Sequence, residues 1–218
     1  MSNRCARILA AGGTAVLVAA LGVPAALAAA TAKTWTVQPG GAITATSSGQ
    51  FTLIDTTTGT VDRCPSATAS GTLKHGSGLP GSRVGSLSAV GFTTCTNPGI
   101  RDSDIKLPLQ ATDLPWHVNL SSYNTATGVV TGTVSHIQIM SPGNGCEFVI
   151  DGTSGTASDG RVRFQYADST GRLTVLTTGS NLHIYDVSQG CLGVFKDGDP
   201  ITLSTTYAVS PEQAITRP

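Results

Sequence analysis

Aromatic and charged residues are both scarce in this 218-residue chain: Phe, Trp and Tyr make up 5% of it, and Asp, Glu, Lys and Arg 12%. Lys and Arg form no cluster, which argues against nucleic acid or an anionic membrane as a partner. No segment has the pattern of a long helix. The chain is instead rich in Thr, Ser, Ala, Gly and Val, which favours strands joined by tight turns.

The short motifs of common catalytic and metal sites are also missing. There is no Gly-x-Ser-x-Gly or Gly-Asp-Ser-Gly-Gly segment to present a serine nucleophile, and no close Cys-x-x-Cys pair to bind zinc. The four histidines are scattered among the expected strands and their edges. A secreted enzyme whose polar residues converge only in the fold stays an alternative, and three of them would be its members: His117, His136 and His183.

The first 30 residues have the order of a secretory signal peptide. Arg4 and Arg7 precede the apolar run "ILAAGGTAVLVAALGVPAALA", which ends at the small-x-small pattern Ala26-Leu27-Ala28. An uncleaved membrane anchor is the alternative, because the run is long enough to cross a bilayer. Pro24 and the glycines break the run where a cleavage site must be extended, so we predict a signal peptide over residues 1–30.

The chain beyond the leader carries no further membrane signal. The C-terminus "SPEQAITRP" has no apolar tail, so neither a cell-wall sorting signal nor a glycolipid anchor is indicated. Removal of Arg4 and Arg7 leaves 11 of the 13 basic residues beside 13 acidic ones, a mild negative balance. The composition is typical of a bacterial protein. We expect a secreted, extracellular protein, with cell-wall association as an option and no stable membrane insertion after the leader is removed.

The cysteines predict two disulfides. Cys5 is lost with the leader, and the mature chain keeps an even number in an oxidising compartment. Of the three possible connectivities we predict the sequence-local one, Cys64 with Cys95 and Cys146 with Cys191. In the loop-closure model each bond contributes roughly 3 to 4 kcal/mol.

Strand patterns recur about every ten residues, which predicts an all-β fold, either a sandwich or a barrel. In "RVRFQYA", residues 161–167, apolar and polar side chains alternate, so one face is expected to be buried. Asp159-Gly160 before it and Asp168-Ser-Thr-Gly171 after it both carry hairpin-turn signals. In "VVTGTVSHIQI" the apolar parity changes between Val134 and Ile137, and a one-residue bulge near Ser135 or His136 would return both sets to the core.

Two stretches of the chain echo each other. "CTNPGIRDSDIKL", residues 95–107, and "CLGVFKDGDPITL", residues 191–203, both run from a cysteine through Asp-x-Asp to an alternating Ile-x-Leu. Upstream, "GAITAT" resembles "GVVTGT". We therefore predict two diverged β repeats, residues 31–123 and 124–218, either as separate domains or as one joint domain.

The Asp-x-Asp pairs are the only candidate metal ligands. Calcium takes six to eight oxygens, more than one such pair supplies, and the glutamate that completes the common calcium-binding loop is absent. Asp and Gly also favour tight turns, which is the simpler interpretation. We expect no cofactor and no metal, although four carboxylates would converge if the fold joined the two turns: Asp102, Asp104, Asp197 and Asp199.

Trp116 and Tyr123 are the candidate ligand-binding residues. Exposed aromatic side chains on a β face commonly stack on sugars or peptides. In a chain so poor in aromatics, burial of Trp116 in the core is the favoured alternative.

Three segments of the chain carry a family resemblance: the leader, "TWTVQPGGAITATSSGQFTLIDTTTGTVDRC" and "DPITLSTTYAVSPEQAIT". Through them the chain resembles small uncharacterised secreted β proteins of actinobacteria. The resemblance implies no activity, so no functional residue is carried over. Apoproteins similar to neocarzinostatin are two-disulfide β sandwiches from such bacteria, but this chain is nearly twice as long and does not match their motifs.

These observations predict a secreted non-catalytic β protein, an envelope-associated or extracellular binding or structural module. Its partner would be an extracellular ligand or a cell-envelope component. The alternatives are a secreted hydrolase with a site formed only in the fold, and a small-molecule carrier or protease inhibitor. A carrier would need an apolar cleft, and an inhibitor a protruding, disulfide-braced loop.

Overall fold

The computed structural model describes residues 34–97, 106–142, 145–155 and 158–217, so the expected signal peptide lies outside the described part. Lys33–Pro218 forms one compact unit. Its described residues contain antiparallel strands and one short 3-10 turn, η1 (Gln189–Cys191). The predicted all-β fold is confirmed. None of the helical structure in these residues is long and apolar enough to span a membrane.

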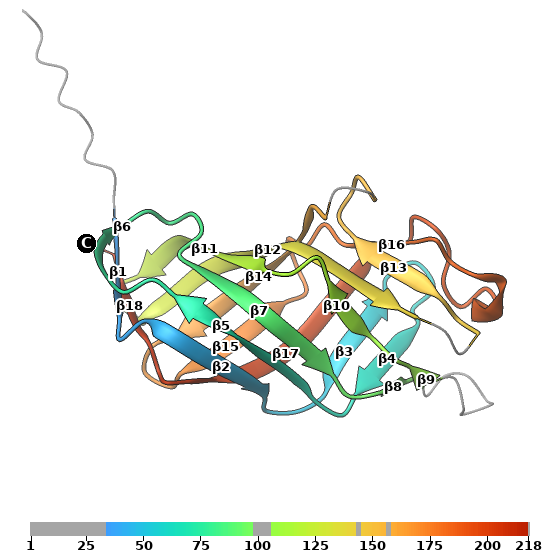
Figure 1. Ribbon diagram of the computed structural model, residues 1–218, viewed down its shortest axis with the longest axis horizontal. Helices are drawn as coiled ribbons and strands as arrows, with labels where there is room; N and C mark the ends of the chain where they lie inside the picture. The colour runs from blue at the N-terminus through green and yellow to red at the C-terminus, as the bar shows by residue number, and fades with distance from the viewer. Residues whose placement is uncertain (1–33, 98–105, 143–144, 156–157, 218) are drawn as a thin grey trace, which may run out of the picture. The chain divides into compact units, whose positions relative to one another are not determined.

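Eight strands close into a barrel, the second of the two architectures that the sequence predicts. The strands follow one another around the barrel in chain order (Figure 1). The last of them pairs antiparallel with the first and with β15, and this closure leaves no exposed edge. They are β2 (Gly41–Ser47), β5 (Ala67–Leu73), β7 (Gly85–Phe92), β11 (Trp116–Asn124), β12 (Val129–Ser141), β14 (Gly160–Ala167), β15 (Arg172–Leu176) and β17 (Ile201–Ser210).

The alternation in β14 puts its apolar side chains inside the barrel, as predicted: Val162, Phe164 and Tyr166 are buried, and the polar residues before each of them are exposed. The turn at residues 168–171 joins β14 to β15 in a hairpin, also as predicted. The hairpin predicted at Asp159-Gly160 is wrong, because β14 pairs with β12 from Gly160 onward. This glycine permits close packing: a Cβ there would lie 2.2 Å from the Ile137 carbonyl oxygen.

The predicted bulge in β12 is confirmed. The register with β14 shifts between Ser135 and Ile137, and His136 takes a left-handed φ of 67°. Val134 and Ile137 are both buried as a result. β7 has a similar shift against β5, where Ala89 pairs with Ser70 and Leu87 with Gly71.

Two extensions continue the barrel strands at one end. The first extension consists of β3 (Phe51–Asp55), β4 (Val61–Cys64), β8 (Cys95–Thr96) and β9 (Lys106–Leu107), and it continues from β17. The second extension consists of β13 (Phe148–Asp151), β16 (His183–Tyr185) and η1, and it continues from β12. Each contains one disulfide, and the pairing is the predicted one, Cys64–Cys95 and Cys146–Cys191.

A three-stranded sheet, which we call the cap, lies at the other end of the barrel (Figure 1). It consists of β6 (Gly76–Leu79), β1 (Trp35–Gln38) and β18 (Ala214–Thr216). Trp35 is buried under it, with the Arg217 guanidinium 5.2 Å from the ring centroid. Arg217 Nη1 also donates to the Ser121 carbonyl, which fastens the cap to β11.

The two predicted repeat ranges share this barrel. Residues 31–123 contribute β2, β5, β7 and β11, and residues 124–218 contribute β12, β14, β15 and β17. A short strand, β10 (Gln110–Thr112), pairs with both β7 and β12 and continues the wall beside β11. Each range also contributes one disulfide-braced extension. That the two ranges are diverged repeats stays a prediction.

Candidate functional site

The barrel encloses a cavity of about 120 Å³. Its wall takes side chains from all eight barrel strands and from the cap, and almost all of them are apolar. A void of this size costs on the order of 3 kcal/mol, by the relation between cavity volume and lost stability. Because protein interiors are otherwise close-packed, the cavity is the feature of this fold that points most directly to a ligand.

The strands of the wall differ in how far their inward side chains are buried. On β11, β12, β14 and β17 most inward side chains are buried. On β2, β5, β7 and β15, six of the inward side chains that line the cavity keep part of their surface accessible: Ala45, Ala69, Leu87, Val90, Leu173 and Val175. Two alanines stand where larger residues would fill the space. The volume is close to that of cavities that bind benzene, and below the range for drug-sized ligands.

Tyr166 and Gln213 close the cavity at the cap with a network of paired polar groups. The Tyr166 hydroxyl donates to the Gln213 carbonyl at 2.9 Å and accepts from the Gln213 amide at 2.8 Å. Gln213 Oε1 accepts from the Gly40 amide, and its Nε2 donates to the Pro211 carbonyl. Burial raises the pKa of Tyr166, so the phenol stays neutral. These hydrogen bonds hold the cap in place, and they leave Tyr166 and Gln213 little hydrogen-bonding capacity for a ligand.

Tyr207 is the polar residue of the wall that remains available. Its hydroxyl makes no hydrogen bond within the described residues, and the residue is 9% exposed. Burial raises the pKa of Tyr207, which keeps the hydroxyl a neutral donor. Thr205 precedes it on the same face of β17, and its buried Oγ1 likewise has no partner in the described part of the chain. Tyr207 was not among the residues predicted from the sequence, although it is the single aromatic residue of the alternating run "ITLSTTYAV".

The two aromatic candidates from the sequence lie at opposite ends of β11. Trp116 is buried, lines the cavity, and donates from Nε1 to the Thr112 carbonyl at 3.0 Å. Tyr123 is half-buried and packs against the edge of the core, seven residues further along and past a bulge at Ser121. The fold does not join them into one aromatic platform.

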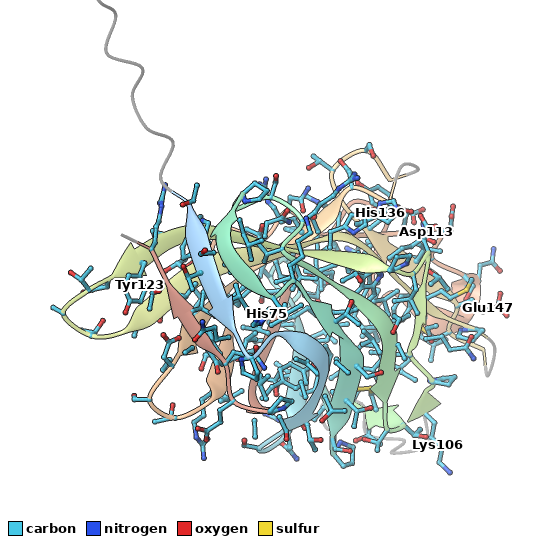
Figure 2. The ribbon with its side chains drawn as sticks, turned by 60° about the vertical axis from the view of Figure 1, so that its left-hand side comes forward. His75, Lys106, Asp113, Tyr123, His136 and Glu147 are labelled. Atoms are coloured by element: carbon cyan, nitrogen blue, oxygen red, sulfur yellow. A yellow bond between two sulfur atoms is a disulfide. The ribbon has the colours of Figure 1, made fainter. Side chains whose placement is uncertain are left out.

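Two of the candidate histidines meet on the outside of the barrel. The rings of His117 and His136 stack with their centroids 5.5 Å apart. His136 Nε2 lies 3.4 Å from Asp113 Oδ2, and Figure 2 shows these two residues side by side. The Asp113 and His136 side chains are 48% and 39% exposed. His183 is elsewhere, on β16, with its Nδ1 against the Asn181 carbonyl.

This histidine pair is not enclosed with a nucleophile. His117 lines a surface depression of about 300 Å³ with Lys74 and Arg83, and His136 does not border it. Desolvation lowers the pKa of His117, and the charges of Arg83 and His136 add to the effect. A triad needs a nucleophile in contact with its base beside an oxyanion site. No hydroxyl hydrogen-bonds to either of these two rings among the described residues.

The described Asp-x-Asp pair forms a turn. Asp197 Oδ1 accepts from the Val187 amide at 2.9 Å, and Asp199 Oδ2 from the Lys196 amide at 3.0 Å. Asp102 and Asp104 lie outside the described residues, so the convergence of four carboxylates stays untested. Within the described ranges, no three His, Cys, Asp or Glu side chains gather as a metal site.

The loop at residues 186–199 has one property expected of a protease inhibitor. Cys191 braces it, and Leu192 beside that cysteine is 76% exposed. However, Leu192 follows the 3-10 turn and takes a left-handed φ of 53°. A segment that pairs with a binding cleft by strand addition must instead be extended. The loop therefore fits the inhibitor alternative less well than the cavity fits a carrier.

Comparison of the chain with models of known families, with curated proteins and with solved structures gives no match. The cavity and the residues that line it are therefore the basis for proposing a function.

Proposed function

We propose that this chain is a secreted, non-catalytic binding protein that holds a small apolar molecule inside its barrel. The observation that carries the proposal is the apolar cavity of about 120 Å³. The leader pattern and two disulfides that close within the compact unit support an extracellular setting. Association with the cell envelope remains a prediction, since no described surface feature selects a partner there.

The cavity defines the class of ligand. Its volume suits one six-membered ring or a short branched alkyl group. The neutral hydroxyl of Tyr207 is a donor without an acceptor, so a ligand with one carbonyl or ether oxygen would pair with it. A charged ligand is disfavoured, because none of the described residues that line the wall is charged.

The cavity is tested with toluene as the probe. Thermal unfolding of the mature protein is followed with and without toluene, since a ligand that binds only the folded state raises Tm. Ala45→Leu and Ala69→Leu fill the space and should abolish the toluene-dependent rise. Ala42→Leu is the matched control, because Ala42 is exposed on the outer face of the same strand as Ala45; it should keep the rise. A wild-type Tm that ignores saturating toluene would refute the proposal.

Tyr207→Phe tests the chemistry of the ligand. Benzaldehyde matches toluene in size but adds an acceptor oxygen. Loss of one hydrogen bond should weaken benzaldehyde binding by roughly 3- to 10-fold and leave toluene unchanged. Tyr123→Phe, outside the cavity, is the control and should change neither affinity, measured by titration calorimetry. Equal losses for both probes would show that Tyr207 acts only through packing.

A further inference from the structure

The β3–β4 hairpin of the first extension buries two aspartates on one face. Leu53 pairs with Asp62 across the hairpin, and Asp55 follows Leu53 by two residues. Asp55 and Asp62 are therefore diagonal neighbours, with their backbones about 7 to 8 Å apart, and the charge of Asp55 acts on Asp62. Both residues are 0% exposed. Neither was singled out from the sequence.

Three of the four carboxylate oxygens of this pair lack a well-formed hydrogen bond. Asp55 Oδ1 accepts from the amides of Thr57 and Thr58 at 2.8 and 3.0 Å. Asp55 Oδ2 and both oxygens of Asp62 are buried without a well-formed hydrogen bond in the described structure. The Asn97 amide is the one side-chain donor that acts on Asp62 in the described structure. Buried polar atoms are nearly always well paired, so these three carboxylate oxygens indicate that the pair lacks part of its partners.

Asp151 in the second extension shows what a satisfied buried carboxylate looks like. It is also 0% exposed, but Oδ1 accepts from the Gly152 amide, and Oδ2 from Gln138 Nε2 and the Ser158 amide. Burial alone therefore does not explain the orphaned oxygens of Asp62.

Among the residues that the structure describes, no basic side chain forms an ion pair with Asp55 or Asp62. Within the described residues the one ion pair is the distant His136–Asp113 contact. Arg63 is exposed, and its position in β4 places it on the face opposite Asp62. The polar side chain that acts on Asp62 is the Asn97 amide, in a residue that is 6% exposed. The described part of the site is thus rich in oxygen and contains no basic side chain.

We propose that Asp55, Asp62 and Asn97 bind one calcium ion. Hard divalent cations select carboxylate and amide oxygens, and calcium accepts an irregular set of six to eight that water can complete. Asp62 precedes Cys64 by two residues, so the ion would brace the same hairpin that the disulfide holds. This site is separate from the barrel cavity and does not depend on the proposed apolar ligand.

Calcium titration of chelator-treated protein tests the site. At about pH 8, where a carboxylate is readily ionised, Tm should rise with calcium concentration, and equilibrium dialysis should give one ion per chain. Asp62→Asn should abolish both effects. Asp151→Asn, the matched buried control, should keep the calcium-dependent rise from its own starting Tm. Magnesium should give a smaller rise, because it demands stricter geometry.

Three results would overturn the proposal. A wild-type Tm that does not respond to millimolar calcium would leave the oxygens to some other partner. A response that persists in Asp62→Asn would place the ion elsewhere, for example at the Asp197–Asp199 turn. A Tm that rises on acidification and ignores calcium would show that a proton shared by the two carboxylates neutralises the pair.

Discussion

The two extensions are built alike and differ in how they treat a buried acid. Each continues a long barrel strand, and each is closed by a disulfide between residues near in sequence. In the second extension Asp151 accepts three hydrogen bonds, whereas in the first Asp62 accepts no well-formed one. A buried carboxylate therefore stabilises or strains a hairpin according to the donors around it.

The largest effect is expected from the disulfides. Replacing Cys64 and Cys95 by serine, or Cys146 and Cys191, opens loops with sequence separations of 31 and 45 residues. Because the entropy term grows only with the logarithm of loop length, each double variant should lose about 4 kcal/mol. Denaturant unfolding measures both. A much smaller loss for one pair would show that its extension does not unfold with the barrel.

The next effect is a pH dependence carried by Asp62 in calcium-free protein. Burial raises the pKa of Asp62 from 3.8 to about 7, while Asn97 opposes the rise and the charge of Asp55 adds to it. The native state thus keeps a proton that the unfolded chain has lost. The contribution of Asp62 to the free energy of unfolding is therefore fully present below about pH 4. It is lost as pH rises through 7, and the total loss is about 4 kcal/mol at most.

Asp62→Asn should remove this slope. With a chelator present, the variant should be more stable than the wild type at about pH 8 and should lose this advantage towards pH 4. Denaturant midpoints across this range measure it. A wild-type slope that survives in Asp62→Asn would assign the titration to another group.

Asp151→Asn should change stability in the opposite direction and destabilise the protein. The asparagine side chain keeps one acceptor oxygen, but its NH2 group faces hydrogen-bond donors that the Asp151 carboxylate accepts from. The free energy of unfolding should therefore fall by about 2 to 3 kcal/mol at neutral pH. The same unfolding experiment compares it directly with Asp62→Asn. If both substitutions changed stability equally, the difference in hydrogen bonding between the two extensions would have no energetic consequence.

The elements that were predictable from the sequence are those with a local signal. The alternation of β14, the bulge at His136, the hairpin at residues 168–171 and the disulfide pairing each depend on residues close together in the chain. The Asp159-Gly160 hairpin failed because a turn signal cannot show that β14 pairs with β12 instead. The cation candidates from the sequence did not include Asp55 and Asp62, because a lone aspartate in a strand resembles any turn-flanking acid.

The sequence by itself determined that this chain forms antiparallel strands with one apolar face, and which cysteines could close short loops. Those properties follow from side-chain alternation and chain entropy, which act over a few dozen residues. Barrel closure, the cavity with Tyr207 on its wall, and the burial of Asp62 without a well-formed hydrogen bond became visible only in the tertiary structure. Closure, void volume and hydrogen-bond pairing depend on contacts between distant segments, because the same strand pattern also fits a sandwich.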